Sequence, residues 1–372
     1  MSLDFLEELA NEPSKFKILA IGDKKRFIAN KMLLGKKCRY GDIAQANEKN
    51  TDIVVVCGEA PIPKLPNIPA LHIYQIINYR AKKFWDNKKE YIGVDLSHHA
   101  SNKHIVEYID EYVEKYYAGR FQKGDKAIAA IKQHFGNDEK RKLKMLSLGC
   151  GCGGAERKFW ETGIFSEIHG CDISDDSIKL AKEKAMEIKG GEAIYYFICD
   201  LNSDEFDNKY DVIFSGNCSH HVERLEFFYN NVKNALNPGG IFIQAEYTGA
   251  ARFQHPRILI ATINFLLFLM IPLGLVRRSC RRHRILADPS EAVRSDEIIP
   301  LTKSFFPDTK VHHNFPDIVL HLLYQCVKTS KFHDNRKRSR RLCVLTSMTE
   351  RLITRLGLIK PNSAFLISRG ET

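Results

Sequence analysis

The residues best placed to do chemistry begin with a glycine-rich segment, LGCGCGG at 148–154. It follows an apolar run at 145–148 and precedes a helix-like stretch at 155–161. Glycines are needed at a tight strand-to-helix turn when a ligand lies against the backbone, because a Cβ would hold the ligand off. A glycine-rich turn alone is a weak signal, so the neighbouring motifs decide its meaning.

Two carboxylates extend this pattern. Asp172 ends the next apolar run, 23 residues after Gly149, and Asp200 ends the run after that. The first spacing is about that at which Rossmann-type sites place an acid on ribose hydroxyls, and open α/β sheets bind ligands at the carboxyl ends of their strands. Either aspartate alone fits a helix N-cap as well. Together with the glycines, they predict a site for a ribose-containing ligand.

These motifs need a parallel sheet to bring them together. Apolar runs at 145–148, 167–171, 193–199, 210–215 and 240–245 are separated by helix-like stretches. The alternation predicts an α/β fold, a Rossmann-like doubly wound sheet, and 364–369 is expected to be its last strand.

The order and spacing of the motifs resemble the class I S-adenosylmethionine-dependent methyltransferases from about residue 127 to the C-terminus. The resemblance is carried by LGCGxG at 148–153, CDIS at 171–174, YDVIFS at 210–215 and LNPGG at 236–240. It implies S-adenosyl-L-methionine as the cofactor. The residues that it implies for the cofactor are Gly149, Gly151 and Gly153 at the methionine and ribose end, Asp172 on the ribose, Ile173 on the adenine, Asp200 and Leu201 at the adenine edge, and Asn217. One departure is Ser147, where the family usually has an acid, so the partner of the cofactor's amino group stays open.

The segment GNCSHHVE at 216–223 follows the fourth run, and in the family this segment faces the transferring methyl group. Methyl transfer to a hydroxyl requires alignment of the acceptor and removal of its proton. A histidine with a pKa of about 6.5 suits that task. We expect His221 to be the base and His220 to be a helix cap or a satisfied core histidine. Glu246 and Tyr247 follow the fifth run and are expected to reach the acceptor.

Two further segments, 247–254 and 287–296, resemble a bacterial methyltransferase subgroup associated with surface-glycan or small-molecule methylation. The implied reaction is methyl transfer to an oxygen, less so a nitrogen, of a small molecule or glycan that could be lipid-linked. The alternatives are an RNA methyltransferase, a non-catalytic cofactor-binding protein and a membrane-associated protein. Nucleic acid is less favoured, because no Asn/Asp-Pro-Pro-Tyr element follows the fourth run and the basic runs lack interleaved aromatics.

The chain divides into four parts. Residues 1–100 form a small α/β unit of unknown role, with strands at 16–22, 52–58 and 71–77 and a helix at 25–34. Residues 101–143 form a helical linker that includes 104–117. Residues 144–250 form the cofactor-binding core, and residues 251–372 form a basic helical insert with the final strands.

Composition and charge limit the function classes. With 44% hydrophobic and 27% charged residues, the 372-residue chain is neither disordered nor collagen-like nor a disulfide mini-protein. The net charge is +11, and residues 251–372 hold 21 Lys and Arg against 9 Asp and Glu. An anionic partner is therefore expected at this end. The ten cysteines and the N-terminus suggest a reduced, cytoplasmic protein, and the cysteine spacings match no zinc pattern, so we expect no metal site.

The apolar run 258–276 has 19 residues without a charge, followed by arginines at 277, 278, 281, 282 and 284. By length it could span a membrane, but one crossing would put the last strand of the sheet on the wrong side. Asn264, Pro272 and Gly274 are expected to break the run. Three interpretations remain: a lid on the site, a contact in a homo-oligomer, or a segment lying on the anionic inner face of the membrane.

Overall fold

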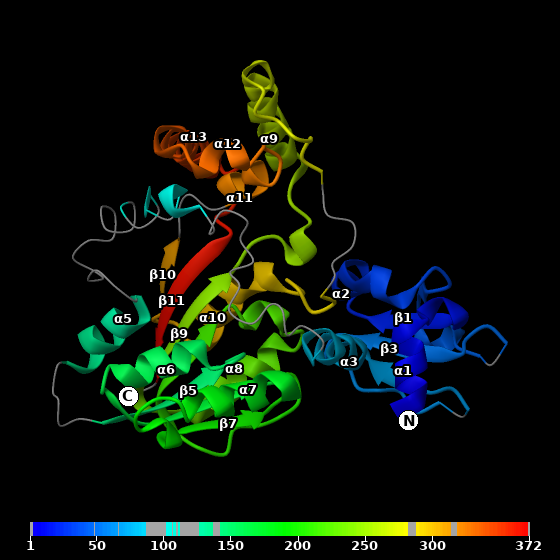
Figure 1. Ribbon diagram of the computed structural model, residues 1–372. Coiled ribbons are helices and arrows are strands. Elements are labelled where there is room, and N and C mark those ends of the chain that lie inside the picture. Colours follow the sequence, from blue (N-terminus) through cyan, green and yellow to red (C-terminus); the bar gives the residue numbers. More distant parts are fainter. Residues whose placement is uncertain are drawn as a thin grey trace.

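The computed structural model describes residues 3–47, 49–65, 67–86, 102–105, 107–108, 111, 126–136, 142–281, 288–313 and 318–370. Within these residues the chain forms a seven-stranded sheet, a separate four-stranded sheet and a group of helices (Figure 1).

The seven-stranded sheet has the strand order β10-β11-β9-β8-β5-β6-β7. Its parallel strands are β5 (Leu143–Leu148), β6 (Phe165–Asp172), β7 (Ile194–Ile198), β8 (Tyr210–Gly216) and β9 (Leu236–Tyr247). At the other edge β11 (Ser363–Arg369) pairs antiparallel with β9, and β10 (Lys310–His313) pairs antiparallel with β11. The fold prediction and the last strand are confirmed. Since β6 and β8 lie on opposite sides of β5, the strand order reverses at β5, where such sheets bind ligands.

Helices cover both faces of this sheet. The bounds are α5 (Lys126–Phe135), α6 (Gly154–Glu161), α7 (Asp175–Ala185), α8 (Leu225–Ala235) and α10 (Ile298–Phe305). Met145 belongs to a core with α5, α6 and α7, whereas its neighbour Leu146 belongs to a core with α8 and α10. Both residues are fully buried because successive strand side chains point to opposite faces.

The N-terminal unit is a parallel sheet of order β2-β1-β3-β4 with three helices. Its elements are α1 (Leu3–Asn11), β1 (Ile18–Gly22), α2 (Lys24–Asn30), β2 (Arg39–Tyr40), β3 (Ile53–Cys57), β4 (Ala70–His72) and α3 (Ile73–Asp86). The predicted strand at 71–77 is wrong after His72, because Ile73, Ile76 and Ile77 are the buried face of α3. Most of the predicted helix at 104–117 lies outside the described residues.

The N-terminal unit docks firmly on the larger one. Buried Arg26 lies 3.1 Å from a carboxylate oxygen of Glu226 and 3.6 Å from one of Glu223. Val293 inserts into the N-terminal core, and α3 packs against α7.

The remaining helices form a third core above the sheet (Figure 1). They are α9 (Arg257–Met270), α11 (Ile318–Tyr324), α12 (Ser330–His333) and α13 (Arg336–Arg355). Short 3-10 helices lie at Pro13–Lys15, Lys31–Leu34, Ile43–Gln45, Gly191–Ala193, Ser219–His221, Ala251–Phe253, Ile271–Leu273 and Ser295–Glu297. Asn264 does not break α9 as expected; the helix continues to Met270, just before Pro272. Within the described residues, every helix is too short or too polar to cross a membrane.

Candidate active site

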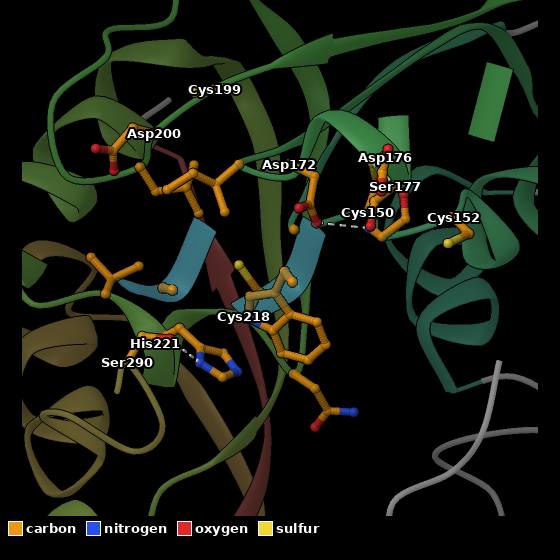
Figure 2. Close-up of a pocket in the computed structure, with 18 of the residues that line it drawn as sticks. Cys150, Cys152, Asp172, Asp176, Ser177, Cys199, Asp200, Cys218, His221 and Ser290 are labelled. Carbon is orange, nitrogen blue, oxygen red and sulfur yellow. Dashed lines mark hydrogen bonds between the residues drawn. The ribbon is translucent and has the colours of Figure 1, made fainter. Parts of the chain in front are cut away.

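A cavity of about 430 Å³ lies where β5, β6 and β8 end. Figure 2 shows Asp172, Asp200, Cys218 and His221 around it. Of the residues singled out from the sequence, the cavity wall includes Gly149, Gly151, Asp172, Ile173, Asp200, Leu201, Asn217 and His221. It also includes Asn78, Ala81 and Trp85 of α3, so the N-terminal unit supplies part of the wall.

The three glycines of the turn are required for different reasons. All three have positive φ, at +62° for Gly149, +52° for Gly151 and +74° for Gly153. A Cβ on Gly149 would collide with the sulfur of Cys218, and one on Gly153 would collide with the ring of Tyr196. A Cβ on Gly151 would meet no described atom within 4 Å, so this glycine borders open space. The turn therefore forms a backbone cradle of the kind that a ligand can approach closely.

Asp172 is held in the wall by backbone donors. Its Oδ2 accepts a hydrogen bond of 2.9 Å from the N–H of Gly151, and its Oδ1 accepts one of 3.0 Å from the N–H of Ser174. Burial raises the pKa of Asp172, and these donors act in the opposite direction. The carboxylate thus ties the glycine turn to the end of β6, at the edge of the cavity (Figure 2).

Asp200 is joined to the N-terminal unit. Asn78 donates a hydrogen bond of 2.5 Å to Oδ2 of Asp200 and accepts one of 3.0 Å from Asn202. Farther along α3, Lys82 lies 2.5 Å from Asp175, and Asp86 accepts a hydrogen bond of 2.9 Å from Ser174. No motif in the sequence points to α3, so the sequence analysis missed Asn78 and Trp85.

The acid missing at position 147 is supplied from another element. The hydroxyl of Ser147 donates to Oε1 of Glu156, a fully buried residue on α6. The other oxygen, Oε2, has no hydrogen-bond partner among the described residues. Burial raises the pKa of Glu156 to about 7. A helix residue nine positions later therefore brings a carboxylate back to the end of β5.

His220 lies below the cavity, between two carboxylates. Its Nδ1–H donates a hydrogen bond of 2.8 Å to Oε2 of Glu246, and its Nε2 lies 3.4 Å from Oε1 of Glu291. Burial alone would lower the pKa of His220, but the hydrogen bonds and charges of the two glutamates raise it to about 10. At neutral pH His220 is therefore an imidazolium and cannot accept a proton.

Glu246 holds the turn after β8 and does not form part of the cavity wall. Its Oε1 accepts hydrogen bonds from the N–H groups of Cys218 and Ser219, both 2.9 Å, and from the hydroxyl of Ser215 at 2.7 Å. Tyr247 donates to the carbonyl of Ala250 at 3.2 Å and is also outside the wall. Neither residue lines the cavity, because β9 carries them behind the turn, and a contact of either with the acceptor stays a prediction.

His221 lies in the cavity wall with a defined tautomer. The hydroxyl of Ser290 donates to Asp288 at 2.7 Å and lies 2.9 Å from Nδ1 of His221. The Ser290 hydroxyl donates its only proton to Asp288, so it can only accept a hydrogen bond from the Nδ1–H of His221. In this tautomer Nε2 carries no proton. Burial and the charge of His220 lower the pKa of His221. At neutral pH, His221 is therefore a neutral imidazole, and its unprotonated Nε2 lies 3.9 Å from Oε2 of Glu291.

Ser290 and Asp288 lie in the distinctive segment 287–296, whose contact with the histidine pair could not be read from the sequence. Among the described residues, one group of potential metal ligands is found: atoms of His220, His221 and Glu291 lie within 4.8 Å of one another. In this arrangement the proton on His220 already supplies a positive charge between Glu246 and Glu291. The absence of a metal site stays a prediction. The cysteines at the strand ends are free thiols, and burial raises the pKa of Cys150 and of Cys218.

Comparison with known proteins finds similarity to methyltransferases within this core. Residues 146–242 match the family model described as a methyltransferase domain. Phosphoethanolamine N-methyltransferase 2 of Caenorhabditis elegans is 35% identical over 118 residues, which are 31% of this chain and 26% of that protein. Malonyl-[acyl-carrier protein] O-methyltransferase 2 of Ilyobacter polytropus is 29% identical over 144 residues, 36% of this chain and 54% of that protein.

The chain thus spans between a quarter and about half the length of these two relatives. Among solved structures it is similar to Haemonchus contortus phosphoethanolamine N-methyltransferase 2 in complex with S-adenosyl-L-methionine, with 14% identity, full coverage of both chains and a TM-score of 0.42. A similarity this distant is no guide to the substrate. Residues 146–242 thus match a methyltransferase domain, and the strands around them form a doubly wound sheet whose order reverses at β5.

Proposed function

We propose that this protein is an enzyme that transfers a methyl group from S-adenosylmethionine to an oxygen of a small molecule or glycan. The observation that carries the proposal is the neutral His221 in the cavity wall, with Nδ1 bonded to Ser290 and an unprotonated Nε2 that lies 3.9 Å from Oε2 of Glu291.

The residues of the cavity fit the cofactor. Asp172 stands at the strand end where a ribose is held, and the cradle at Gly151 leaves room for a ligand. Glu156 is fully buried behind the residues that line the cavity, and its unpartnered oxygen suits an ammonium group, since a buried polar atom without a partner is costly. Asp200, with Asn78, would face the adenine edge. The cofactor, when bound, supplies a methyl group on a positively charged sulfur.

For this reaction the protein has to align the acceptor with the cofactor and to remove the proton of the acceptor hydroxyl. Nε2 of His221 accepts the proton of the acceptor hydroxyl as the new C–O bond forms and the C–S bond breaks. His220 carries a fixed positive charge beside His221, since its Nδ1–H faces Glu246 and its Nε2–H faces Glu291. It is therefore a positioning residue in this proposal, as is Glu246, which fixes the turn that carries both histidines.

The test uses the full chain, labelled S-adenosylmethionine and a panel of sugars and hydroxylated small molecules, with methylation read by mass spectrometry. His221→Asn is expected to lower kcat by about 10²- to 10⁴-fold, the usual contribution of a general base. Its affinity for the cofactor in calorimetry is expected to change little. His333→Asn, on α12 outside the cavity wall, is the matched control. Equal kcat in His221→Asn and wild type would overturn the base assignment, and no cofactor binding by folded protein would overturn the function.

We also propose a cytoplasmic location for this activity. Its support is that all ten cysteines are free thiols. When the protein is alkylated in extracts of its host cells, mass spectrometry is expected to find all ten cysteines alkylated. Disulfide-linked peptides would contradict the location.

A further inference from the structure

Helix α9 has two apolar faces, and the described residues of the chain cover one of them. One face packs against α11, α12 and α13 through Leu259, Ile263, Leu266, Leu267 and Met270. The opposite face is exposed, and the short helix that follows α9 is exposed as well. The large apolar residues there are Ile258, Phe265, Phe268, Leu269, Ile271 and Leu273.

The exposed face is large and continuous. Exposure of the side chains is 61% at Phe265, 66% at Phe268 and 69% at Leu273. Residues 258, 261, 265 and 268 recur at intervals of three and four, so they lie along one side of the helix. A helix that is apolar all round is expected to be covered all round, and contiguous exposed apolar patches mark interaction sites.

Hydrogen bonds fix residues 271–281 against α9 and against the loop after α11. The exposed face therefore has a defined structure. The side chain of Asn264 donates to the carbonyl of Cys280 at 3.0 Å and accepts from its N–H at 2.9 Å. The returning segment pairs with the loop after α11, where Lys328 donates to the carbonyl of Leu275 at 2.8 Å and Val276 bridges to Val327. None of the described residues of α9 lines the cavity, so the structure gives the lid interpretation no support.

Among the described residues that flank the patch in the sequence, all the charged ones are arginines. Arg257 precedes it, and Arg277, Arg278 and Arg281 follow it, all four exposed. The sequence has no Asp or Glu between Glu246 and Asp288. A second copy of this chain, docked on the same patch across a two-fold axis, would bring these arginines together at the rim, which like charges disfavour. An anionic surface satisfies both the apolar face and its rim.

We propose that the tip formed by α9 and residues 271–281 docks on the surface of a lipid bilayer that contains anionic headgroups. The exposed apolar side chains enter the boundary between headgroups and acyl chains, and the arginines meet the phosphates. A helix of 14 residues is about 21 Å long, shorter than the apolar core of a bilayer of about 30 Å, so it lies on the membrane and does not cross it. This surface is separate from the methyl-transfer site and goes beyond the proposed function.

Co-sedimentation of the full chain with vesicles tests the proposal. Wild type is expected to pellet with phosphatidylcholine–phosphatidylglycerol vesicles, and less so at high salt. Phe268→Ser combined with Leu273→Ser is expected to weaken partitioning into the vesicles by about tenfold or more. Each substitution removes the free energy gained when an apolar side chain moves from water into the bilayer. Arg277→Gln is expected to weaken it by about fivefold. Met186→Ser is the matched control, since Met186 is an exposed apolar residue, at 71%, beside α7.

Calorimetric titration with S-adenosylmethionine on every variant reports a folded main domain, so failure here is distinct from failure of the proposed function. Wild type that stays in the supernatant with the mixed vesicles would overturn the proposal, as would equal pelleting with pure phosphatidylcholine. A dimer in light scattering that Phe268→Ser dissociates, without vesicle binding, would assign the patch to a second copy instead.

Discussion

Glu246→Gln tests how the site is held together. The substitution keeps the size of the side chain, and an amide oxygen can still accept from Cys218, Ser219 and Ser215. The amide nitrogen, however, meets the Nδ1–H of His220, which is itself a donor. His220 loses the partner that stabilises its charge, and an uncompensated buried charge typically costs about 3–5 kcal/mol. We expect Glu246→Gln to lower the free energy of unfolding by about 3 kcal/mol near pH 6.5, since Glu291 remains as a second partner.

The pH dependence gives the sharper test. The pKa of His220 is about 10 in the folded protein and about 6.5 when unfolded, so its contribution is full below pH 6.5 and is lost as pH rises through 10. Integrated, it is about 4 kcal/mol at pH 6.5 and about 1 kcal/mol at pH 9. The pKa of Glu246 is lowered by its donors, although burial alone would raise it, so the carboxylate's contribution is present above its unfolded pKa and is lost in acid. The pair therefore stabilises most between about pH 4.5 and 6.5.

Urea unfolding followed by fluorescence, at pH 6.5 and at pH 9, measures both effects. The free energy of unfolding of wild type exceeds that of Glu246→Gln, and this excess should be about 2–3 kcal/mol smaller at pH 9 than at pH 6.5. Glu192→Gln, at an exposed glutamate in a 3-10 helix, is the control for loss of one negative charge. A difference that is below about 1 kcal/mol, or that stays constant with pH, would refute the assignment of His220 as a buried imidazolium.

Four further changes test the cavity. Asp172→Asn should weaken S-adenosylmethionine binding by about 10- to 150-fold in calorimetry, the loss expected for hydrogen bonds to a charged group; unchanged affinity would remove Asp172 from the ribose site. Glu156→Gln should also weaken it, and because burial raises the pKa of Glu156 to about 7, wild-type affinity should fall as pH drops below 7 while the variant stays flat; a flat wild-type profile would contradict the role. Asn78→Ala, compared with Asn67→Ala in an N-terminal loop, should weaken cofactor affinity through the lost contact with Asp200, and equal affinities would show that α3 is only a wall. Gly149→Ala should lower the thermal midpoint, because its φ is +62° and its Cβ would meet Cys218; Gly136→Ala, also at positive φ but in open space, should do so less.

The sheet and the cofactor side of the site could be predicted because their signals are local. Each of the five predicted core strands is a continuous apolar run, and the glycines and Asp172 directly follow two of them. The strand predicted at 71–77 was wrong because the local signal there does not distinguish a strand from a helix. An apolar run of that length fits a buried strand or one face of a helix, and only packing against β3 and α1 makes it the start of α3.

The contacts that orient His221 and Asp200 could not be predicted because they join distant residues. His221 is oriented by Ser290, 69 positions later, and Asp200 meets Asn78, 122 positions earlier. Glu156 shows the same limit at short range. The loss of the acid at Ser147 is visible in the sequence, but its replacement depends on which face of α6 turns toward β5.

The position of β11 bears on how the protein is made. This strand lies between β9 and β10, and Ala364 pairs with Glu246, the residue that anchors His220. More than a hundred residues, including α9 and α13, are synthesised between these two partners. Strand β9, which carries Glu246, thus gains this neighbouring strand only after residues 363–369 have been synthesised. Such long-range pairing makes folding slow and leaves an unpaired strand edge on the nascent chain. A ribosome-bound chain that lacks β11 is accordingly expected to depend on chaperones until β11 has been synthesised.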